Sequence, residues 1–317
     1  MLATLIDGPF DNPHWFFEIK WDGVRAITTI AGRGKSPTIS SRNGKDLLGQ
    51  FPELARLDRA FSRLPVIVDG EIVALDEQGR SSFQLLQQRL NRHSPDAALV
   101  RKVPVCYSIF DLLYVERADL RKQPLAQRKE RLLQLLRPKA AQVMLSKHIV
   151  GKGKRLFNFA RAHSLEGIIA KDSESPYLER RSRLWLKIKT HFEQEFVIGG
   201  WTEPRGSREA FGALLLGLYE GDELHYVGHV GTGFNRALLQ TVMAAMRPLE
   251  SATKPFVERP KSNSPAHWIK PRLVAQVRFA EWTNERILRA PVFIGLRHDK
   301  NPRDCVREVP VPAGRAR

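Results

Sequence analysis

Short β-type runs separated by turn residues constrain the fold of this chain more than any other feature. In the first 190 residues such runs alternate apolar and polar residues or are rich in β-branched residues, which is typical of strands. They are Phe16–Lys20, Arg25–Ile30, Thr38–Arg42, Val66–Leu75, Val105–Val115, Glu166–Lys171 and Leu184–Ile188. Helical periodicity is found at residues 51–64, 83–90, 125–136 and 154–163. The pattern predicts an α+β fold in which strands dominate.

The pattern of predicted strands and helices changes near residue 190, where we place a domain boundary. Glu195–Trp201 reads as a strand, and Ala213–Tyr219 and Leu224–Val230 flank a strong hairpin signal, Glu220-Gly221-Asp222-Glu223. A helix over 235–246 and a strand over 273–282 complete a pattern that favours a small β-barrel of the OB type. A chain of 317 residues is long enough for two such domains, 1–190 and 191–317. The tail from residue 309, with prolines and a glycine, is predicted to fray.

The charge of the chain indicates a polyanionic partner. Lys and Arg number 51 against 34 Asp and Glu, which gives a net charge of +17 and a pI near 10.2. Nucleic acid or an anionic membrane surface could supply the opposite charge. No apolar run approaches the length of a membrane span, and the first residues lack a basic leader, so nucleic acid is favoured. Two cysteines are too few for a disulfide framework, which fits a reducing cytoplasm.

The segment Glu18-Ile19-Lys20-Trp21-Asp22-Gly23-Val24-Arg25 contains a candidate nucleophile. A lysine amine is protonated near its reference pKa of about 10.4 and is then no nucleophile. Apolar neighbours and a nearby cation such as Arg25 lower this pKa and free the lone pair. We therefore predict a lowered pKa for Lys20. The alternative interpretation is a surface lysine before a hairpin turn.

Three later segments have the composition of a phosphate and metal site. Val68-Asp69-Gly70-Glu71-Ile72-Val73 places a carboxylate in a buried strand, and Glu166 is followed five residues later by Lys171. In Trp185-Leu186-Lys187-Ile188-Lys189 the period of two puts both lysines on one face of a strand. Two ammonium groups there suit a phosphate. Structural ion pairs or a solvated strand face would explain the same residues.

Taken together, the motifs resemble those of the covalent nucleotidyltransferases in order and spacing. They are Glu18-x-Lys20-x-Asp22-Gly23-x-Arg25, Ser41-Arg42-Asn43-Gly44, Asp69-Gly70-Glu71, Tyr107-Ser108-Ile109-Phe110-Asp111, Glu166-Gly167-x-x-x-Lys171 and Trp185-x-Lys187-x-Lys189. The set resembles an ATP-dependent DNA ligase. The opening, Asp119–Leu132 and Phe293–Lys300 are most similar to the bacterial LigD-type ligase module. The resemblance covers about residues 1–308. It implies a nucleotidyltransferase (adenylation) domain of antiparallel sheets with flanking helices over 1–190 and an OB-fold domain over 191–317.

The resemblance also assigns roles. Lys20 would attack the α-phosphate of ATP and carry AMP as a phosphoramidate. Lys187 and Lys189 would act with it as catalytic residues and, with Lys171, would neutralise the α-phosphate. The remaining nucleotide contacts would come from Glu18 near the adenine, Arg25 and Arg42 at ribose and phosphate, Glu71 at the ribose hydroxyl, Phe110 against adenine, and Arg297, Asp299 and Lys300 at the leaving pyrophosphate. Glu71 and Glu166 would hold Mg²⁺, with Mn²⁺ as an alternative.

The function implied by this resemblance is the sealing of DNA 5′-phosphate and 3′-hydroxyl ends at nicks or breaks. Partners would be DNA and, in non-homologous end joining, Ku; we expect a monomer in the bacterial cytoplasm, associated with the nucleoid and not with a membrane. Because Lys20 lies close to the start, we expect no N-terminal DNA-binding domain, and no polymerase or nuclease module. An RNA ligase or a GTP-using capping enzyme shares the lysine chemistry and stays an alternative. A non-catalytic nucleic-acid-binding protein is a more remote one.

Overall fold

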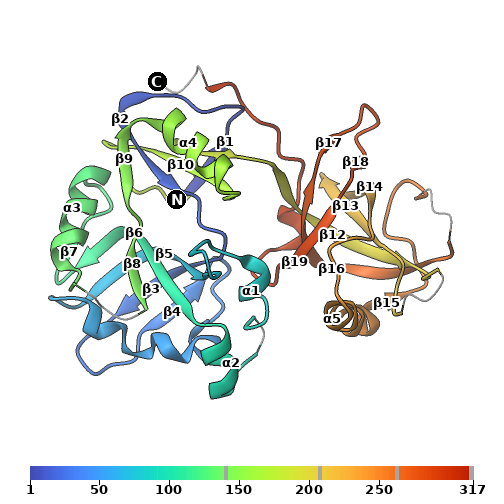
Figure 1. Cartoon of the computed structure of the whole chain (residues 1–317), viewed down its shortest axis with the longest axis horizontal. Coiled ribbons are helices and arrows are strands. Elements are labelled where there is room, and N and C mark those ends of the chain that lie inside the picture. Colours follow the sequence, from blue (N-terminus) through green and yellow to red (C-terminus); the bar gives the residue numbers. More distant parts are fainter. Residues whose placement is uncertain (91, 139–141, 206–208, 261–263, 314–317) are drawn as a thin grey trace. The chain divides into compact units, whose positions relative to one another are not determined.

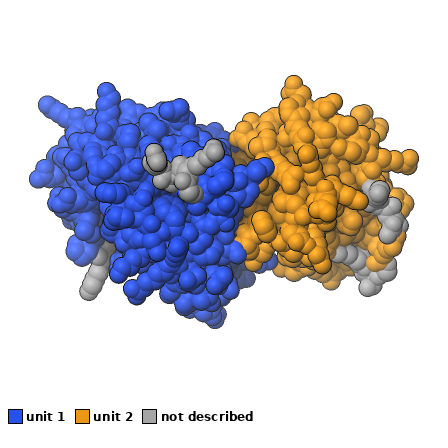
Figure 2. Space-filling view, turned by 90° about the horizontal axis from the view of Figure 1, so that it is seen from above, with its two compact units in different colours: residues 1–190, 309–317 blue, residues 191–308 orange. Residues whose placement is uncertain are grey.

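The chain forms two compact units in a computed structural model that describes residues 1–90, 92–138, 142–205, 209–260 and 264–313. The first unit contains residues 1–190 together with 309–317, and the second contains residues 191–308 (Figure 2). Each unit has its own sheets and its own set of buried residues. Within the described residues, no helix is both long enough and apolar enough to cross a membrane.

The first sheet of the first unit has the strand order β1-β11-β10-β2-β9. Its strands are β1 Leu2–Leu5, β11 Arg181–Lys189, β10 Gly167–Asp172, β2 Asn12–Ile19 and β9 His148–Gly151. One face packs on helix α4, Gly153–Ala162, which lies against this sheet in Figure 1. The core there includes Phe17, Ile168, Ala170, Leu186 and Ile188. Since side chains alternate along a strand, the residues between these point to the opposite face.

The second sheet of the first unit has the order β4-β3-β5-β6-β7, with β8 also paired to β6. Its strands are β4 Thr38–Ser41, β3 Val24–Ile30, β5 Val66–Ala74, β6 Val105–Val115, β7 Ala118–Asp119 and β8 Val143–Leu145. Helix α3, Leu125–Leu135, packs on β6, and the short α1, Phe83–Leu86, packs on β5. Helix α2 covers Ala97–Lys102.

The prediction of an α-helix over residues 51–64 is wrong, because the segment there is a 3-10 helix. It covers Pro52–Ala60 and is the second of two 3-10 turns, the first being the short one at Leu48–Gln50. Arg56 lies inside the second turn with φ −110° and ψ 28°, outside helical geometry. Leu54 and Leu57 are buried, as the apolar spacing predicts. The non-helical backbone at Arg56 prevents a continuous α-helix.

The second unit is a β-barrel with one main helix. The strand order is β14-β13-β12-β16-β15, and β19 pairs with another part of β16. An isolated bridge between Thr232 and Val292 joins the segment just after β14 to β19. The strands are β12 Phe192–Thr202, β13 Leu214–Glu220, β14 Glu223–Val230, β15 Glu250–Ser251, β16 Ala266–Phe279 and β19 Val292–Leu296, with α5 at Arg236–Met246 and a small hairpin of β17 Glu281–Trp282 and β18 Leu288–Arg289. This closure confirms the predicted OB-type barrel.

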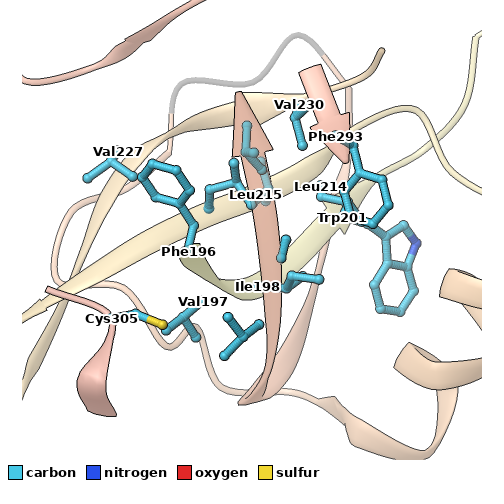
Figure 3. Packing of buried hydrophobic residues seen from close by; sticks show 14 of the residues in the cluster. Phe196, Val197, Ile198, Trp201, Leu214, Leu215, Val227, Val230, Phe293 and Cys305 are labelled. Atoms are coloured by element: carbon cyan, nitrogen blue, oxygen red, sulfur yellow. The ribbon is translucent and has the colours of Figure 1, made fainter. Parts of the chain in front are cut away.

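The barrel is filled from several strands at once. Phe196 and Ile198 of β12, Leu214 of β13, Val230 of β14 and Phe293 of β19 are all buried, and Figure 3 shows their side chains gathered in one interior. The predicted hairpin is also confirmed, because Glu220 pairs with Glu223 across the turn between β13 and β14.

The predicted fraying of the tail is wrong for residues 309–313, while residues 314–317 lie outside the described chain. Val311 N donates to Leu5 O at 3.1 Å, and Asp7 N donates to Val311 O at 3.2 Å. Ala313 N donates to Asp7 Oδ1 at 3.0 Å. Proline removes a donor only at its own position, so Val311 between two prolines still pairs with the first strand.

Gly23 is required by close packing of the first turn against β5. A Cβ at this position would overlap the carbonyl oxygen of Ile72 and crowd Val73. We expect Gly23→Ala to lower the free energy of unfolding by about 1–3 kcal/mol, measured by urea denaturation. Gly8→Ala is the matched control, because nothing lies within 4 Å of a Cβ there. The control should stay within about 0.5 kcal/mol of the wild type; equal effects of the two substitutions would contradict the packing argument.

Candidate functional site

The face of the first sheet opposite α4 contains polar residues predicted from the sequence. Across β10, Ile169 pairs with Glu18 of β2 on one side and with Lys187 of β11 on the other. Lys189 pairs with Gly167, and Lys20 N donates to Gly167 O at 2.9 Å. Partners directly opposite in a sheet share a face. Glu18, Lys20, Lys187 and Lys189 therefore lie on one surface, opposite the α4 core.

Lys20 forms an ion pair through Nζ with Oε1 of Glu166. Burial lowers the pKa of Lys20, but attraction to Glu166 outweighs it, and Asp22 and Glu71 add to the attraction, so the pKa is raised above its ordinary value. The prediction of a lowered pKa is therefore wrong for this arrangement. The sequence pointed to Arg25 as the nearest charge, whereas the fold places carboxylates around the amine.

Glu166 has the properties expected of a metal ligand. Its side chain is 8% exposed, and its second oxygen, Oε2, is buried without a hydrogen-bond partner among the described residues. Such an oxygen is costly to bury unless something binds it. Mg²⁺ prefers oxygen ligands and often takes only one or two carboxylates besides phosphate. No group of three or more acidic, histidine or cysteine side chains suited to a metal occurs within the described ranges.

The second sheet contributes Arg25, Glu71 and Phe110. Arg25 and Glu71 are opposite each other on β3 and β5. The guanidinium of Arg25 makes a bidentate pair with the buried Asp69, at 3.0 Å from Nε to Oδ1 and 2.5 Å from Nη2 to Oδ2. This pair fixes the direction of Arg25. Arg25 also lies 5.6 Å from the centre of the Phe110 ring.

Lys171 lies between two aromatic rings and a carboxylate. Its Nζ is 4.2 Å from the centre of Phe110 and 4.3 Å from that of Trp185, and it donates to Glu18 Oε2 at 3.0 Å. Burial lowers the pKa of Lys171, and although Glu18 opposes this, Lys129 adds to it, so the pKa falls to about 8.

Two residues of α3 were missed by the sequence reasoning. Lys129 Nζ donates to Glu18 Oε1 at 2.7 Å, and Arg128 makes a fully buried bidentate pair with Asp111 at 2.8 and 2.9 Å. The signal in the sequence was weak but present. Arg128 and Lys129 fall on the same side of the helix as Leu125 and Leu132, which the apolar pattern assigns to the core.

Arg42 lies in the exposed turn that follows β4. This turn is closed by Gly44 N, which donates to Ser41 O at 2.9 Å, and by Lys45 N, which donates to Ser41 Oγ at 3.0 Å. The positive φ of 74° at Gly44 explains the glycine in this motif.

The last predicted residues belong to the second unit. Arg297 makes a bidentate pair with Asp299, at 2.8 and 2.7 Å, and also donates to Gln276 Oε1 at 2.7 Å. Burial raises the pKa of Asp299, but attraction to Arg297 outweighs it, and the net shift is downward. Lys300 pairs with Glu195 at 2.9 Å. These contacts fix the orientation of all three side chains within that unit.

Comparison with known proteins gives a consistent result. Residues 1–189 match the family described as the ATP dependent DNA ligase domain, and residues 207–300 match the ATP dependent DNA ligase C terminal region. The chain is 36% identical over 315 residues to the multifunctional non-homologous end joining protein LigD of Pseudomonas aeruginosa, covering 98% of this chain and 36% of that protein. With the corresponding Mycobacterium tuberculosis H37Rv protein it shares 36% identity over 299 residues, 93% of this chain and 37% of that one.

The chain thus spans a little over one third of the length of these curated relatives. Among solved structures it is similar to a mycobacterial DNA ligase D complexed with ATP and MES. The TM-score is 0.68 at 32% identity, and the match covers 97% of this chain and 98% of that chain.

The raised pKa of Lys20 predicts a slow amine in the nucleotide-free protein. Glu166→Gln removes the largest attraction that raises this pKa, so the acylation profile of Lys20 should move to lower pH by about 1–3 units. The measurement is mass-spectrometric quantification of Lys20 after brief acylation over a pH series. Glu130→Gln, on the exposed side of α3, should leave the profile where it is. An unshifted profile in Glu166→Gln would show that Glu166 does not control this amine.

Proposed function

Because the chain belongs to the ATP-dependent DNA ligase family, we propose that it joins a DNA 5′-phosphate to a 3′-hydroxyl through AMP carried on Lys20. The observation that carries this proposal is the arrangement around Lys20. The amine contacts Glu166, and it lies on the same sheet face as Lys187 and Lys189. A nucleophile, a carboxylate and phosphate-binding cations are the components that nucleotidyl transfer requires, since such reactions depend on positioning and charge neutralisation.

In the proposed first step, Lys20 Nζ attacks the α-phosphorus of ATP. The ammonium first gives up one proton, which Glu166 Oε1 is in position to accept, because only the neutral amine has a lone pair. The new N–P bond then forms as the P–O bond to pyrophosphate breaks, and the nitrogen releases a second proton to solvent to leave a neutral phosphoramidate. Mg²⁺, or Mn²⁺ in its place, would be held by Glu166 and Glu71 and would withdraw charge from phosphate oxygens. AMP then passes to the DNA 5′-phosphate with cleavage of the N–P bond. The 3′-hydroxyl finally displaces AMP and closes the strand.

The other residues of the first unit divide between the two ends of the nucleotide. Lys187 and Lys189 would stabilise the charge on the α-phosphate as catalytic residues. Arg25 and Arg42 would contact ribose and phosphate, with Arg25 oriented by Asp69. Glu71 would also bind the ribose hydroxyl. Phe110, half-buried, would stack on adenine, and Glu18 would lie beneath the base.

For the second unit the proposal rests on the match to the last motif of the family. Arg297, Asp299 and Lys300 would orient the leaving pyrophosphate. Asp299 supports this role by holding the Arg297 guanidinium in one direction, which reduces the entropy lost when an anion binds. Lys300 would exchange its Glu195 partner for a phosphate oxygen.

The wider setting follows from the names of the relatives. The Pseudomonas and mycobacterial proteins are non-homologous end joining proteins, so repair of broken ends, with Ku as a partner, is the proposed context. The net charge of +17 supports binding to DNA in the nucleoid. A monomer with one site is the simplest form for this chemistry.

The central test is incubation with α-labelled ATP and Mg²⁺, followed by a nick-sealing assay. The wild type should form a labelled protein that pyrophosphate discharges, and Lys20→Ala should reduce the label by at least about 10³-fold because no other group replaces the nucleophile. Lys35→Ala, at an exposed turn, is the control and should label like the wild type. A labelled adduct that persists in Lys20→Ala would reject the assignment. Preference for GTP, or sealing of RNA alone, would support the capping or RNA-ligase alternatives.

A further inference from the structure

We infer that Lys171 is a positioning residue of the adenine pocket and not a ligand of the α-phosphate. Its ammonium holds the Glu18 carboxylate and lies against the Phe110 ring, so it acts on the base through these two side chains. This inference rests on the proposed function and changes one role that the family resemblance assigns.

The ammonium of Lys171 is closed off from an incoming phosphate. The side chain is 2% exposed, and around Nζ lie the Glu18 carboxylate and the rings of Phe110 and Trp185. Phe110 and Trp185 themselves meet edge to face, with centroids 5.9 Å apart and an interplanar angle of 78°. A phosphate oxygen could reach Nζ only by displacing a ring or the carboxylate. Lys187 and Lys189, on the same face of the sheet, are by contrast only half-buried.

The register of the sheet separates Lys171 from the site of phosphate attack. Lys20 is hydrogen-bonded to Gly167, and Lys189 pairs with the same residue, so the nucleophile and one phosphate cation share one end of β10. Lys171 lies four residues further along this strand, which corresponds to about 13 Å between backbone positions. A nucleotide linked to Lys20 through its α-phosphate would extend its base toward that far end, where Phe110 lies.

Lys171 can affect adenine binding through its contacts with Phe110 and Glu18. A cation over one face of an aromatic ring draws electron density toward itself, which makes the other face a better partner for an electron-rich purine. The same ammonium holds Glu18, whose other oxygen is held by Lys129. Lys129 Nζ also donates to the backbone oxygen of Phe110 at 3.4 Å, so one network of contacts connects the Glu18 carboxylate with Phe110.

The network also makes a clean substitution possible. In Lys171→Met the carboxylate of Glu18 would keep Lys129 at 2.7 Å and Ser146 Oγ at 2.8 Å. The methionine side chain is of similar length and suits the apolar space between two rings. The substitution therefore removes the charge with little loss of local packing.

The experiment separates the two ends of ATP with probes that contain only one of them. Protein discharged with pyrophosphate is equilibrated with labelled ATP without divalent metal, and adenosine or inorganic tripolyphosphate is added as competitor. Lys171→Met should weaken competition by adenosine by up to about tenfold, because Phe110 loses the cation that polarises its ring and Glu18 loses one of its donors. Competition by tripolyphosphate should stay within about twofold of the wild type. Lys187→Met, the matched control, should show the reverse pattern.

A double-mutant cycle tests whether Lys171 acts through Phe110. Phe110→Leu should also weaken competition by adenosine. Adding Lys171→Met to Phe110→Leu should have little further effect, because the ring through which the charge acts is gone. Additive effects of the two substitutions would overturn this link. Lys171→Gln, which keeps a donor toward Glu18, replaces Lys171→Met if the latter melts below the assay temperature.

The outcomes distinguish this inference from the proposed function. Weaker tripolyphosphate competition in Lys171→Met, with or without a change for adenosine, would make Lys171 a phosphate ligand and overturn the inference. Unchanged competition by both probes would overturn it as well, as would failure of adenosine to compete in the wild type. In all three cases nick sealing by the wild type would leave the ligase proposal standing, whereas absence of an adduct on Lys20 would remove both.

Discussion

The register of β10 between β2 and β11 is the constraint on which the candidate site depends. It sets Glu18 and Lys187 on either side of Ile169, and it sets Lys20 and Lys189 beside Gly167. A shift of β10 by one residue against its neighbours would turn Ile168 and Ala170 away from the α4 core and place Ile169 and Lys171 in it. Gly167 is needed at the same point, because a Cβ there would overlap the carbonyl oxygen of Ile188. Hydrophobic burial on one face thus fixes the chemistry of the other.

A second principle is that buried and half-buried cations of the first unit are paired with carboxylates. Arg25 pairs with Asp69, Arg128 with Asp111, and Lys129 and Lys171 share Glu18. Burying one such charge alone would cost several kcal/mol, so each pair must form as the sheets assemble. The high net charge of the chain is therefore not a property of this interior. It lies in side chains that remain able to meet a polyanion.

Much of this could be predicted from the sequence, for reasons that differ by element. The strands β5, β6 and β12 followed from apolar runs, and the hairpin of β13 and β14 followed from a four-residue turn signal. The side of β11 that carries Lys187 and Lys189 followed from a period of two. Charge partners did not follow, because they are set by contacts between distant segments. Glu18 and Lys129 are 111 residues apart, and no local pattern specifies that pair. The prediction that the tail frays was wrong for the same reason, because Val311 pairs with residues at the start of the chain.

The pKa of Lys20 is set by burial and by its contact with a carboxylate, which act in opposite directions. Desolvation alone would lower its pKa, but the fold places Glu166 against the amine, and the net shift is upward. The ion pair with Glu166 therefore keeps Lys20 charged and fixes the direction of its side chain. In the proposed reaction, a metal ion bound to Glu166 would weaken this attraction, and the cations Lys187 and Lys189 on the same face would then favour the neutral amine. Under the proposed function, activation of the lysine would in this way be coupled to occupation of the site, because Glu166 has one oxygen on Lys20 and a second, buried oxygen without a hydrogen-bond partner among the described residues.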